Sequence, residues 1–230
     1  MTFCGGPTAA HFVIAGGAAK WITSPPVNDA LLQFFGDNHA PGRIGLIGAT
    51  DVIGRLVRAG ESGMTSDGKP SRWSHSFVLG ERRADGQLYI YESDLRVSVT
   101  DWQVQNGAME SRLAKWCRDD IEHACVLGMG LTADESAALL RKALGYAYDE
   151  QHLRYPVGEL FGTIWATLTR RLDKKNVFDD KYAVQCATFV RMCYRDIGRD
   201  PLGTVVDLTN TSPEAFYRSD AFSFRNEWHR

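Results

Sequence analysis

Residues 73–93 read WSHSFVLGERRADGQLYIYES, and this stretch decides the fold. It holds two strand-like runs, 74–80 and 87–93, on either side of the polar sequence RRADG. Such runs joined by a short polar segment predict a β-hairpin. Because successive side chains on a strand point to opposite faces, every second residue of each run lies on the same face of the expected sheet.

A histidine and an acidic residue fall on one face of this hairpin. A four-residue loop at Arg82–Asp85 pairs His75 with Glu92, and a shift of one residue at both ends pairs it with Asp94 instead. A histidine on an apolar strand face is more often a core group than a base. In either register, however, a carboxylate lies across from the imidazole, where it can hold its tautomer and stabilise the imidazolium.

A predicted helix late in the chain carries a cysteine for which this histidine could act as the base. Residues 182–198, YAVQCATFVRMCYRDIG, predict a helix over about 184–197. Cys186 falls in its first turn, where free N–H groups and the helix dipole favour a thiolate. Cysteine is among the most buried residue types, so its position alone is weak evidence, and Cys193 is explained as core. A nucleophilic cysteine needs a base within reach, and His75 is the candidate.

The rest of the chain predicts strands first and helices later, which is typical of an α+β domain. Further strands are expected at 43–48, 96–99 and 123–129, and further helices at 27–35, 52–59, 132–147 and 159–172. The sequence from Thr132 to Glu135 forms a capping box at the start of one helix. The polar, glycine-rich stretch 60–72 is longer than a connection needs, which indicates a functional loop.

Composition excludes several classes of protein. The 230 residues include 26 basic and 28 acidic side chains, a balance without the electrostatic footprint of a nucleic-acid-binding protein. No run approaches the ~20 apolar residues of a membrane span, and the start lacks the basic region of a signal peptide. Five dispersed cysteines, an odd number, do not make a disulfide scaffold. We expect a soluble protein with reduced thiols, cytoplasmic by default, with no nucleic-acid partner and no stable membrane insertion.

Taken together, these stretches resemble the circularly permuted NlpC/p60 group of papain-like enzymes, the YaeF/YiiX-like amidases, to which the lecithin:retinol acyltransferase-like proteins are related. The resemblance covers roughly residues 40–225. Its motifs are a strand opening with glycine, a Trp-Ser-His strand, a strand ending in an acidic residue, a Gly-x-x-Tyr-Asp segment, a helix headed by cysteine and a Ser-Pro-acidic turn. They are matched at 42–47, 73–78, 89–93, 145–149, 185–190 and 211–216. Two positions depart from the pattern: Arg43 stands where the family usually has Asp, and Ala-Thr follows Cys186 in place of Ser-Glu.

The resemblance implies roles for three residues: Cys186 as nucleophile, His75 as general base and Glu92 as the third residue that orients the histidine. It also implies a permuted papain-like fold, in which a small antiparallel sheet packs against the cysteine-bearing helix. Residues 1–40 would then be an N-terminal extension and 41–230 the hydrolase domain. Oxyanion stabilisation is expected from the amides at the helix N-terminus, and no metal or organic cofactor is implied.

Three functions compete at this point. The first is an amidase or peptidase acting on peptides such as the stem peptides of bacterial cell wall. The second is a lipid acyl hydrolase or acyltransferase, for which apolar residues at 160–165 could form a wall, although an ordinary core helix is the commoner explanation. The third, a binding module without catalysis, is disfavoured because it needs no Cys-His-Glu set. A substrate outside the cytoplasm would require a signal-independent export route, as for an antibacterial effector with an immunity protein as partner.

Overall fold

A six-stranded antiparallel sheet forms the centre of the protein, with strand order β4-β3-β2-β1-β5-β6. The computed structural model describes residues 27–65, 67–98, 103–148, 181–203 and 211–230. The strands are β1 (Ile44–Ala49), β2 (His75–Arg82), β3 (Leu88–Ser98), β4 (Gln103–Arg112), β5 (Ile121–Gly128) and β6 (Phe224–His229). The order places β1 and β2 in the middle of the sheet, so the predicted hairpin strand with His75 is a central one.

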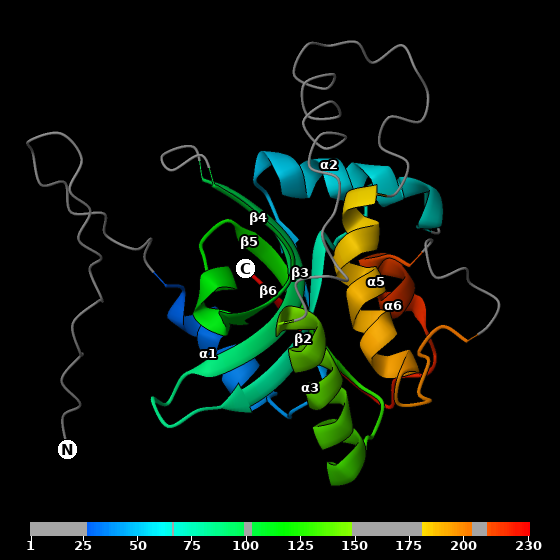
Figure 1. Cartoon of the computed structure of the whole chain (residues 1–230). Coiled ribbons are helices and arrows are strands. Elements are labelled where there is room, and N and C mark those ends of the chain that lie inside the picture. The colour runs from blue at the N-terminus through cyan, green and yellow to red at the C-terminus, as the bar shows by residue number, and fades with distance from the viewer. Residues whose placement is uncertain (1–26, 66, 99–102, 149–180, 204–210) are drawn as a thin grey trace, which may run out of the picture.

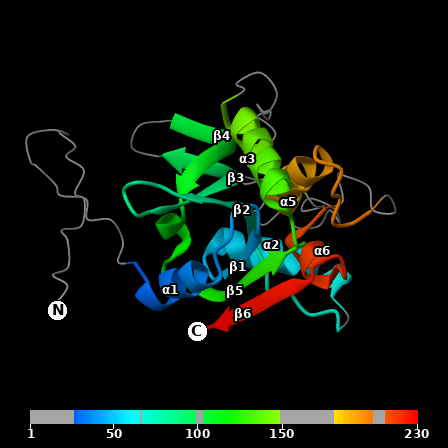
Figure 2. The ribbon, with the colours of Figure 1, turned by 90° about the horizontal axis from the view of Figure 1, so that it is seen from below.

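Helices cover both faces of the sheet and enclose two hydrophobic cores. They are α1 (Asp29–Asp37), α2 (Val52–Gly60), α3 (Ala133–Tyr148), α5 (Lys181–Arg195) and α6 (Pro213–Arg218), with the short 3₁₀ helices η1 (Glu61–Met64) and η2 (Leu113–Trp116). Figures 1 and 2 show α1 on one side of the sheet and α3, α5 and α6 on the other. One core joins α3, α5 and α6 to the sheet, and the other lies under α1. The α+β class, with an antiparallel sheet packed against the cysteine-bearing helix, is confirmed.

Local sequence signals explain where several elements begin. In the predicted capping box, the Thr132 N–H donates to Glu135 Oε2 at 2.8 Å, and the Glu135 N–H donates to Thr132 Oγ1 at 3.2 Å. These two bonds satisfy amides that the first turn of α3 would leave unpaired. On α1, Leu31 and Phe35 lie one helical turn apart and are fully buried under the sheet. The described part of the predicted N-terminal extension is therefore packed on the domain.

One strand prediction is corrected in its extent, and two strands were missed. Residues 96–98 are in a strand as expected, but they continue β3 from the hairpin rather than begin a strand of their own. The edge strands β4 and β6 were not predicted at all. Both are polar in sequence, QVQNGAMESR and FRNEWH, as edge strands that discourage pairing with other chains commonly are. The predicted helix at 159–172 lies outside the described residues.

No helix in the described part of the chain is both long and apolar enough to cross a membrane.

Candidate active site

The β2–β3 hairpin adopts the second of the two registers that the sequence allows. Val78 pairs with Tyr91, and this register, continued to the start of β2, sets His75 opposite Asp94. The other register left open by the sequence, in which His75 pairs directly with Glu92, does not form. The reason is an irregularity in β2 between residues 79 and 82, which shifts the register close to the turn.

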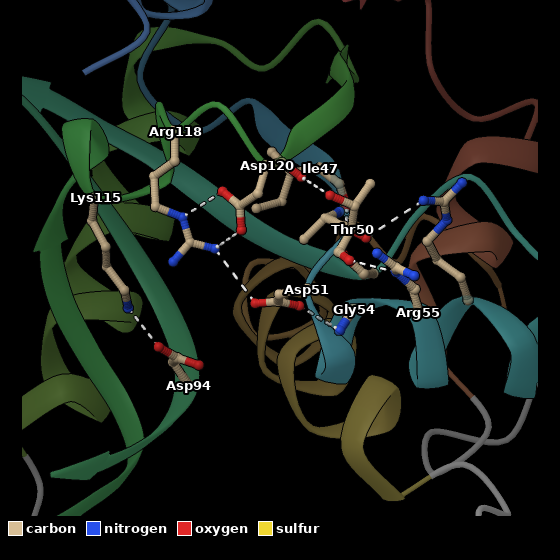
Figure 3. A network of polar contacts seen from close by, with 12 residues as sticks. Ile47, Thr50, Asp51, Gly54, Arg55, Asp94, Lys115, Arg118 and Asp120 are labelled. Carbon is tan, nitrogen blue, oxygen red and sulfur yellow. Dashed lines mark hydrogen bonds and ion pairs between the residues drawn. The ribbon is translucent and has the colours of Figure 1, made fainter. Parts of the chain in front are cut away.

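The carboxylate that binds His75 is nevertheless Glu92, which lies diagonally across from it. His75 Nε2 and Glu92 Oε2 are 2.8 Å apart. Diagonal neighbours on one face of an antiparallel pair are within reach of long side chains, which explains the contact. The residue directly opposite, Asp94, bonds to Lys115 Nζ at 2.5 Å, as Figure 3 shows. The structure therefore brings His75 and Glu92 together and gives Asp94 a different partner.

The helix η2 supplies two more donors to Glu92. Lys115 Nζ donates to Glu92 Oε1 at 2.6 Å, and the indole N–H of Trp116 donates to Oε2 at 2.6 Å. The Trp116 ring also lies against the imidazole of His75, with 4.6 Å between the ring centroids. The fully buried carboxylate is therefore compensated by hydrogen bonds and by a lysine charge, as a buried ion requires.

Charge, rather than burial, decides the protonation of this pair. Burial alone would raise the pKa of Glu92, but the hydrogen bond from His75 and the charges of Lys115 and His75 outweigh it and hold that pKa well below its usual range. Burial alone would lower the pKa of His75, but the charge and hydrogen bond of Cys186, followed by those of Glu92, raise it to about 10. At neutral pH the buried imidazole is therefore an imidazolium beside a carboxylate.

Cys186 is the third residue of the arrangement, and it interacts with the imidazole of His75. Its interaction with His75 is the largest of the effects that raise the pKa of the histidine, so the sulfur and the imidazole are direct neighbours. Because His75 Nε2 faces Glu92, Nδ1 is the nitrogen left for Cys186. Cys186 is only 3 % exposed, so this contact is largely shielded from water.

The position of Cys186 on its helix differs from the prediction. The sequence predicts a helix from about Val184, with Cys186 in the first turn, but α5 begins at Lys181. Cys186 is therefore the sixth helical residue and lies in the second turn. The free N–H groups of a helix belong to its first four residues, so the Cys186 amide lies beyond them. His75, rather than the end of the helix, is therefore the neighbour through which this site could activate Cys186.

The other described cysteines fill core positions, as predicted for Cys193 from its place on the helix. Cys193 is fully buried, and burial raises the pKa of its thiol far above the usual range. Burial likewise raises the pKa of Cys117 and of Cys125 to about 12. These thiols resist ionisation and are poor nucleophiles. Cys4 lies outside the described residues, as does the apolar segment 160–165.

Sequence reasoning missed three polar residues of this region: Lys115, Trp116 and Glu61. Lys115 and Trp116 follow β4, a strand that was not predicted, so nothing placed them beside the hairpin. Glu61 lies in the loop whose length indicated a function, and its carboxyl is buried within the electrostatic reach of Cys186. The loop length was the available signal for Glu61, and it pointed to the segment rather than to the residue.

Among the residues that the structure describes, no three His, Cys, Asp or Glu side chains gather in a way that could hold a metal ion. No family model and no curated protein matches the chain. Among solved structures, the chain is similar to the metalloprotein yiiX from Escherichia coli O157:H7, at 15% sequence identity over 80% of this chain and 94% of that one, with a TM-score of 0.46.

Proposed function

We propose that the protein is a cysteine-nucleophile hydrolase that cleaves an amide bond through an acyl-enzyme. Cys186 is the nucleophile, His75 the acid and base, and Glu92 the carboxylate that orients His75. One observation carries this proposal: the buried imidazole of His75 interacts with a cysteine and also with a carboxylate, whose Oε2 lies 2.8 Å from Nε2, and both groups raise the pKa of the histidine. A nucleophile, a base and a third group that orients the base are the parts that covalent acyl transfer needs.

Acylation begins from the thiolate of Cys186 and the imidazolium of His75. The sulfur attacks the carbonyl carbon of the substrate, the C–S bond forms, and the π electrons move onto the carbonyl oxygen. When the tetrahedral intermediate collapses, the C–N bond breaks and the leaving nitrogen takes the proton from Nδ1 of His75. Glu92 accepts the other ring N–H throughout, which fixes the imidazole and stabilises its charged form.

Deacylation uses the neutral imidazole left by that step. Nδ1 of His75 takes a proton from a water molecule, whose oxygen attacks the thioester carbon. Collapse of the second intermediate breaks the C–S bond and releases the carboxylic acid product. Cys186 is then a thiolate and His75 an imidazolium again, so protons and charge balance over the cycle.

The resemblance noted in the sequence makes cell-wall stem peptides the first substrates to test. Ester bonds of lipids follow the same sequence of steps, so both classes belong in one experiment. Purified full-length protein is incubated with soluble muropeptides and, separately, with phospholipid vesicles, and the products are identified by liquid chromatography and mass spectrometry. We expect peptide cleavage by the wild type, and its loss in Cys186→Ala and in His75→Ala, because the two residues act as a unit.

Cys193→Ala is the matched control for this experiment, because it removes a buried thiol from the same helix without touching His75. It should cleave as the wild type does. Release of fatty acid without peptide cleavage would move the proposal from amide to ester substrates. If the wild type and Cys186→Ala gave the same products from both substrates, the protein would not be a cysteine hydrolase.

A further inference from the structure

A cavity lies between the long loop after α2 and the helix α6, and the steps above give it no role. Its volume is about 490 Å³, which is within the ordinary range of small-molecule sites. One wall comes from the loop between Thr65 and Arg72, and the other comes from α6. This loop belongs to the stretch 60–72, whose length indicates a function. The sequence and the cavity therefore point to the same part of the molecule.

Positive charge is in excess around this cavity. The charged side chains of its lining are the basic Lys69, Arg72 and Arg218 and the acidic Asp67 and Glu214. Next to the lining, Glu227 forms an ion pair with Arg72. Arg225 adds a cation there, with its Cζ 4.8 Å from the centre of the Tyr217 ring. Four basic side chains therefore stand against three acidic ones.

The basic side chains are also the more accessible ones. Glu214 is buried, and its Oε2 accepts the hydroxyl of Ser71 at 2.9 Å, so a donor already binds this carboxylate. In contrast, the side chain of Lys69 is 78 % exposed and that of Arg72 is 39 % exposed. A ligand that enters the cavity from solvent therefore meets Lys69 and Arg72 before it meets Glu214.

Both of these cations can accept a further partner. Lys69 Nζ lies 3.2 Å from Asp67 Oδ2, but exposed ion pairs stabilise little, so the lysine can turn to a ligand at small cost. Arg72 donates from Nη1 to Glu227 and from Nη2 to the hydroxyl of Tyr217. A guanidinium has five N–H groups, so three of them have no acceptor in the described part of the chain.

Hydrogen bonds fix the walls of the cavity before a ligand binds. Within the loop, the Thr65 hydroxyl donates to the Lys69 carbonyl at 2.6 Å. At the end of the loop, Arg58 Nε donates to the Ser71 carbonyl at 2.9 Å, and the Ser71 hydroxyl joins the loop to Glu214 on α6. A site that is already formed loses less conformational entropy when it binds a ligand.

The cavity is close to the proposed catalytic histidine. Arg72 on its wall and His75 are three residues apart in the chain. Because a chain extends by at most ~3.6 Å per residue, their Cα atoms are no more than about 11 Å apart. Trp73, which lies between them in the chain, packs on Tyr217 of the cavity wall with 5.0 Å between the ring centroids. A substrate a few residues long can therefore span the distance from the cavity to His75.

We propose that this cavity is a substrate subsite, in which Lys69 and Arg72 bind an anionic group of the molecule whose carbonyl is attacked by Cys186. This inference rests on the proposed function and deepens it, because it names a feature of the substrate. The substrate carries a negative charge roughly 10 Å from the bond that breaks. Carboxylate and phosphate groups both match a lysine and a guanidinium. The proposed amide substrate favours a peptide carboxylate, and a phosphate is an alternative outcome of the test.

Activated esters of defined length test the subsite. Each is a p-nitrophenyl ester that acylates Cys186, and its acyl chain ends in a carboxylate, a phosphate or a neutral methyl ester. p-Nitrophenyl acetate is too short to reach the cavity and reports the chemistry alone. Acylation of the full-length protein is followed by intact-protein mass spectrometry over a range of ester concentrations, which gives an apparent Kd. We expect the wild type to bind the long carboxylate esters about tenfold more tightly than their methyl esters.

Variants of the two cations should lose this discrimination. The ratio of the two apparent Kd values should fall to about threefold in Lys69→Gln, whose side chain is largely exposed, and to about one in Arg72→Gln. Lys142→Gln is the matched control, because Lys142 is also an exposed lysine beside an aspartate, with its Nζ 3.7 Å from Asp196, but lies on α3 and outside the lining. It should discriminate as the wild type does.

Several outcomes would overturn the inference. If the wild type bound the long anionic esters and their methyl esters equally, the cavity would not be an anion subsite. If both kinds of ester were weakened equally in Lys69→Gln and Arg72→Gln, these residues would have a structural role. An equal loss of discrimination in Lys142→Gln would assign the preference to general surface charge. Tighter binding of the phosphate esters than of the carboxylate esters would keep the subsite and identify its ligand as a phosphate.

The acetate arm separates this inference from the proposed function. If p-nitrophenyl acetate acylates Cys186 of the wild type but the longer esters show no preference for a charged end, the subsite fails and the hydrolase stands. If no ester acylates Cys186, the proposed function fails, and a substrate subsite fails with it.

Discussion

Two buried glutamates lie in the region of the proposed catalytic pair, and their pKa values are shifted in opposite directions. Glu92 on β3 is 0 % exposed and Glu61 on η1 is 1 % exposed, so water reaches neither. The pKa of Glu92 is held well below the ordinary glutamate range because His75 and Lys115 outweigh burial, whereas the pKa of Glu61 is raised by burial and by the charge of Cys186. The two carboxyl groups are therefore equally buried, and the neighbouring groups decide the direction in which each pKa is shifted.

The difference lies in what each region offers the carboxyl group. Glu92 receives three donors, His75, Lys115 and Trp116, two of which carry positive charge. Glu61 has the backbone N–H of Glu214 and the hydroxyl of Ser71 as partners, neither of which carries charge, and the electrostatic effect of Cys186 raises its pKa further. The surroundings therefore shift the pKa values of two equally buried carboxyl groups in opposite directions.

The largest effect is expected from removing the charge of Glu92. Glu92→Gln leaves the buried His75 without its anion, while Lys115 keeps Asp94 as a partner. We expect acetylation of Cys186 by p-nitrophenyl acetate, measured by intact-protein mass spectrometry, to fall by about 10²- to 10⁴-fold. Loss of one partner from a buried ion pair should also lower the free energy of unfolding by about 3–5 kcal/mol. Urea unfolding measures the second effect. The difference in unfolding free energy between the wild type and Glu92→Gln should become smaller in acid. The ionised Glu92 stabilises the fold above the ordinary glutamate pKa, and this stabilisation is lost as the pH falls toward the depressed pKa of the folded state.

Asp94→Asn is the matched control for Glu92, since both carboxylates bond to Lys115 but Asp94 lies on the position directly opposite His75. Its acetylation should stay within about tenfold of the wild type. If Asp94→Asn cost as much as Glu92→Gln, register rather than the observed hydrogen bond would select the carboxylate that orients the histidine.

A smaller loss is expected from removing the lysine charge. Lys115→Met keeps the length of the side chain but deletes the donor to Glu92 Oε1. Its loss should slow acetylation by about tenfold, which corresponds to one charge-assisted hydrogen bond of roughly 1.5 kcal/mol. The upper pH limit of acetylation should also move below the pKa of about 10 of His75, since a less ionised Glu92 supports the imidazolium less. An unchanged rate and pH limit would mean that His75 alone keeps Glu92 charged.

The part of the site on the β2–β3 hairpin could be predicted from the sequence, because it depends on residues that are close together in the chain. The alternation in residues 73–93 places His75 and Glu92 on one face whichever register forms, and the cysteine helix is apparent from its own periodicity. The register itself could not be read, because it depends on the irregularity in β2 between residues 79 and 82. In the register that forms, Glu92 contacts His75 because its side chain is long enough to reach diagonally across the pair of strands.

The supporting residues could not be read, because long-range contacts create them. Lys115 and Trp116 reach Glu92 through the pairing of β3 with β4, a polar edge strand whose sequence carries little strand signal. Glu61 accepts a hydrogen bond from the backbone N–H of Glu214, which lies 153 residues further along the chain. Neither composition nor spacing near position 61 indicates that contact, and a solvent-facing glutamate in a polar loop is the ordinary expectation.

Trp116 tests whether the neutral donor of the Glu92 region matters beyond the two charges. Trp116→Phe removes the N–H donated to Glu92 Oε2 and keeps an aromatic ring against His75. We expect acetylation to slow by about threefold and unfolding to become easier by about 1 kcal/mol, the value of one hydrogen bond. A loss as large as that of Glu92→Gln would mean that the indole N–H, and not the cations, keeps the carboxylate ionised.

The two glutamates should also respond to pH with opposite signs in unfolding experiments. Glu61 has a raised pKa in the folded state, so its contribution to stability is fully present below the unfolded pKa of about 4.3 and is lost as pH rises through the folded pKa. Glu61→Gln has no such proton to lose. As the pH rises from about 4 to about 8, the unfolding free energy of Glu61→Gln should therefore increase relative to that of the wild type. The change should be smaller than the roughly 3–5 kcal/mol expected for Glu92→Gln. Glu92→Gln should instead fall further behind the wild type between about pH 3 and about pH 6. If the unfolding free energies of the two variants changed with pH in the same direction relative to the wild type, the two pKa values would be shifted in the same direction. The different surroundings of the two glutamates would then not explain their ionisation.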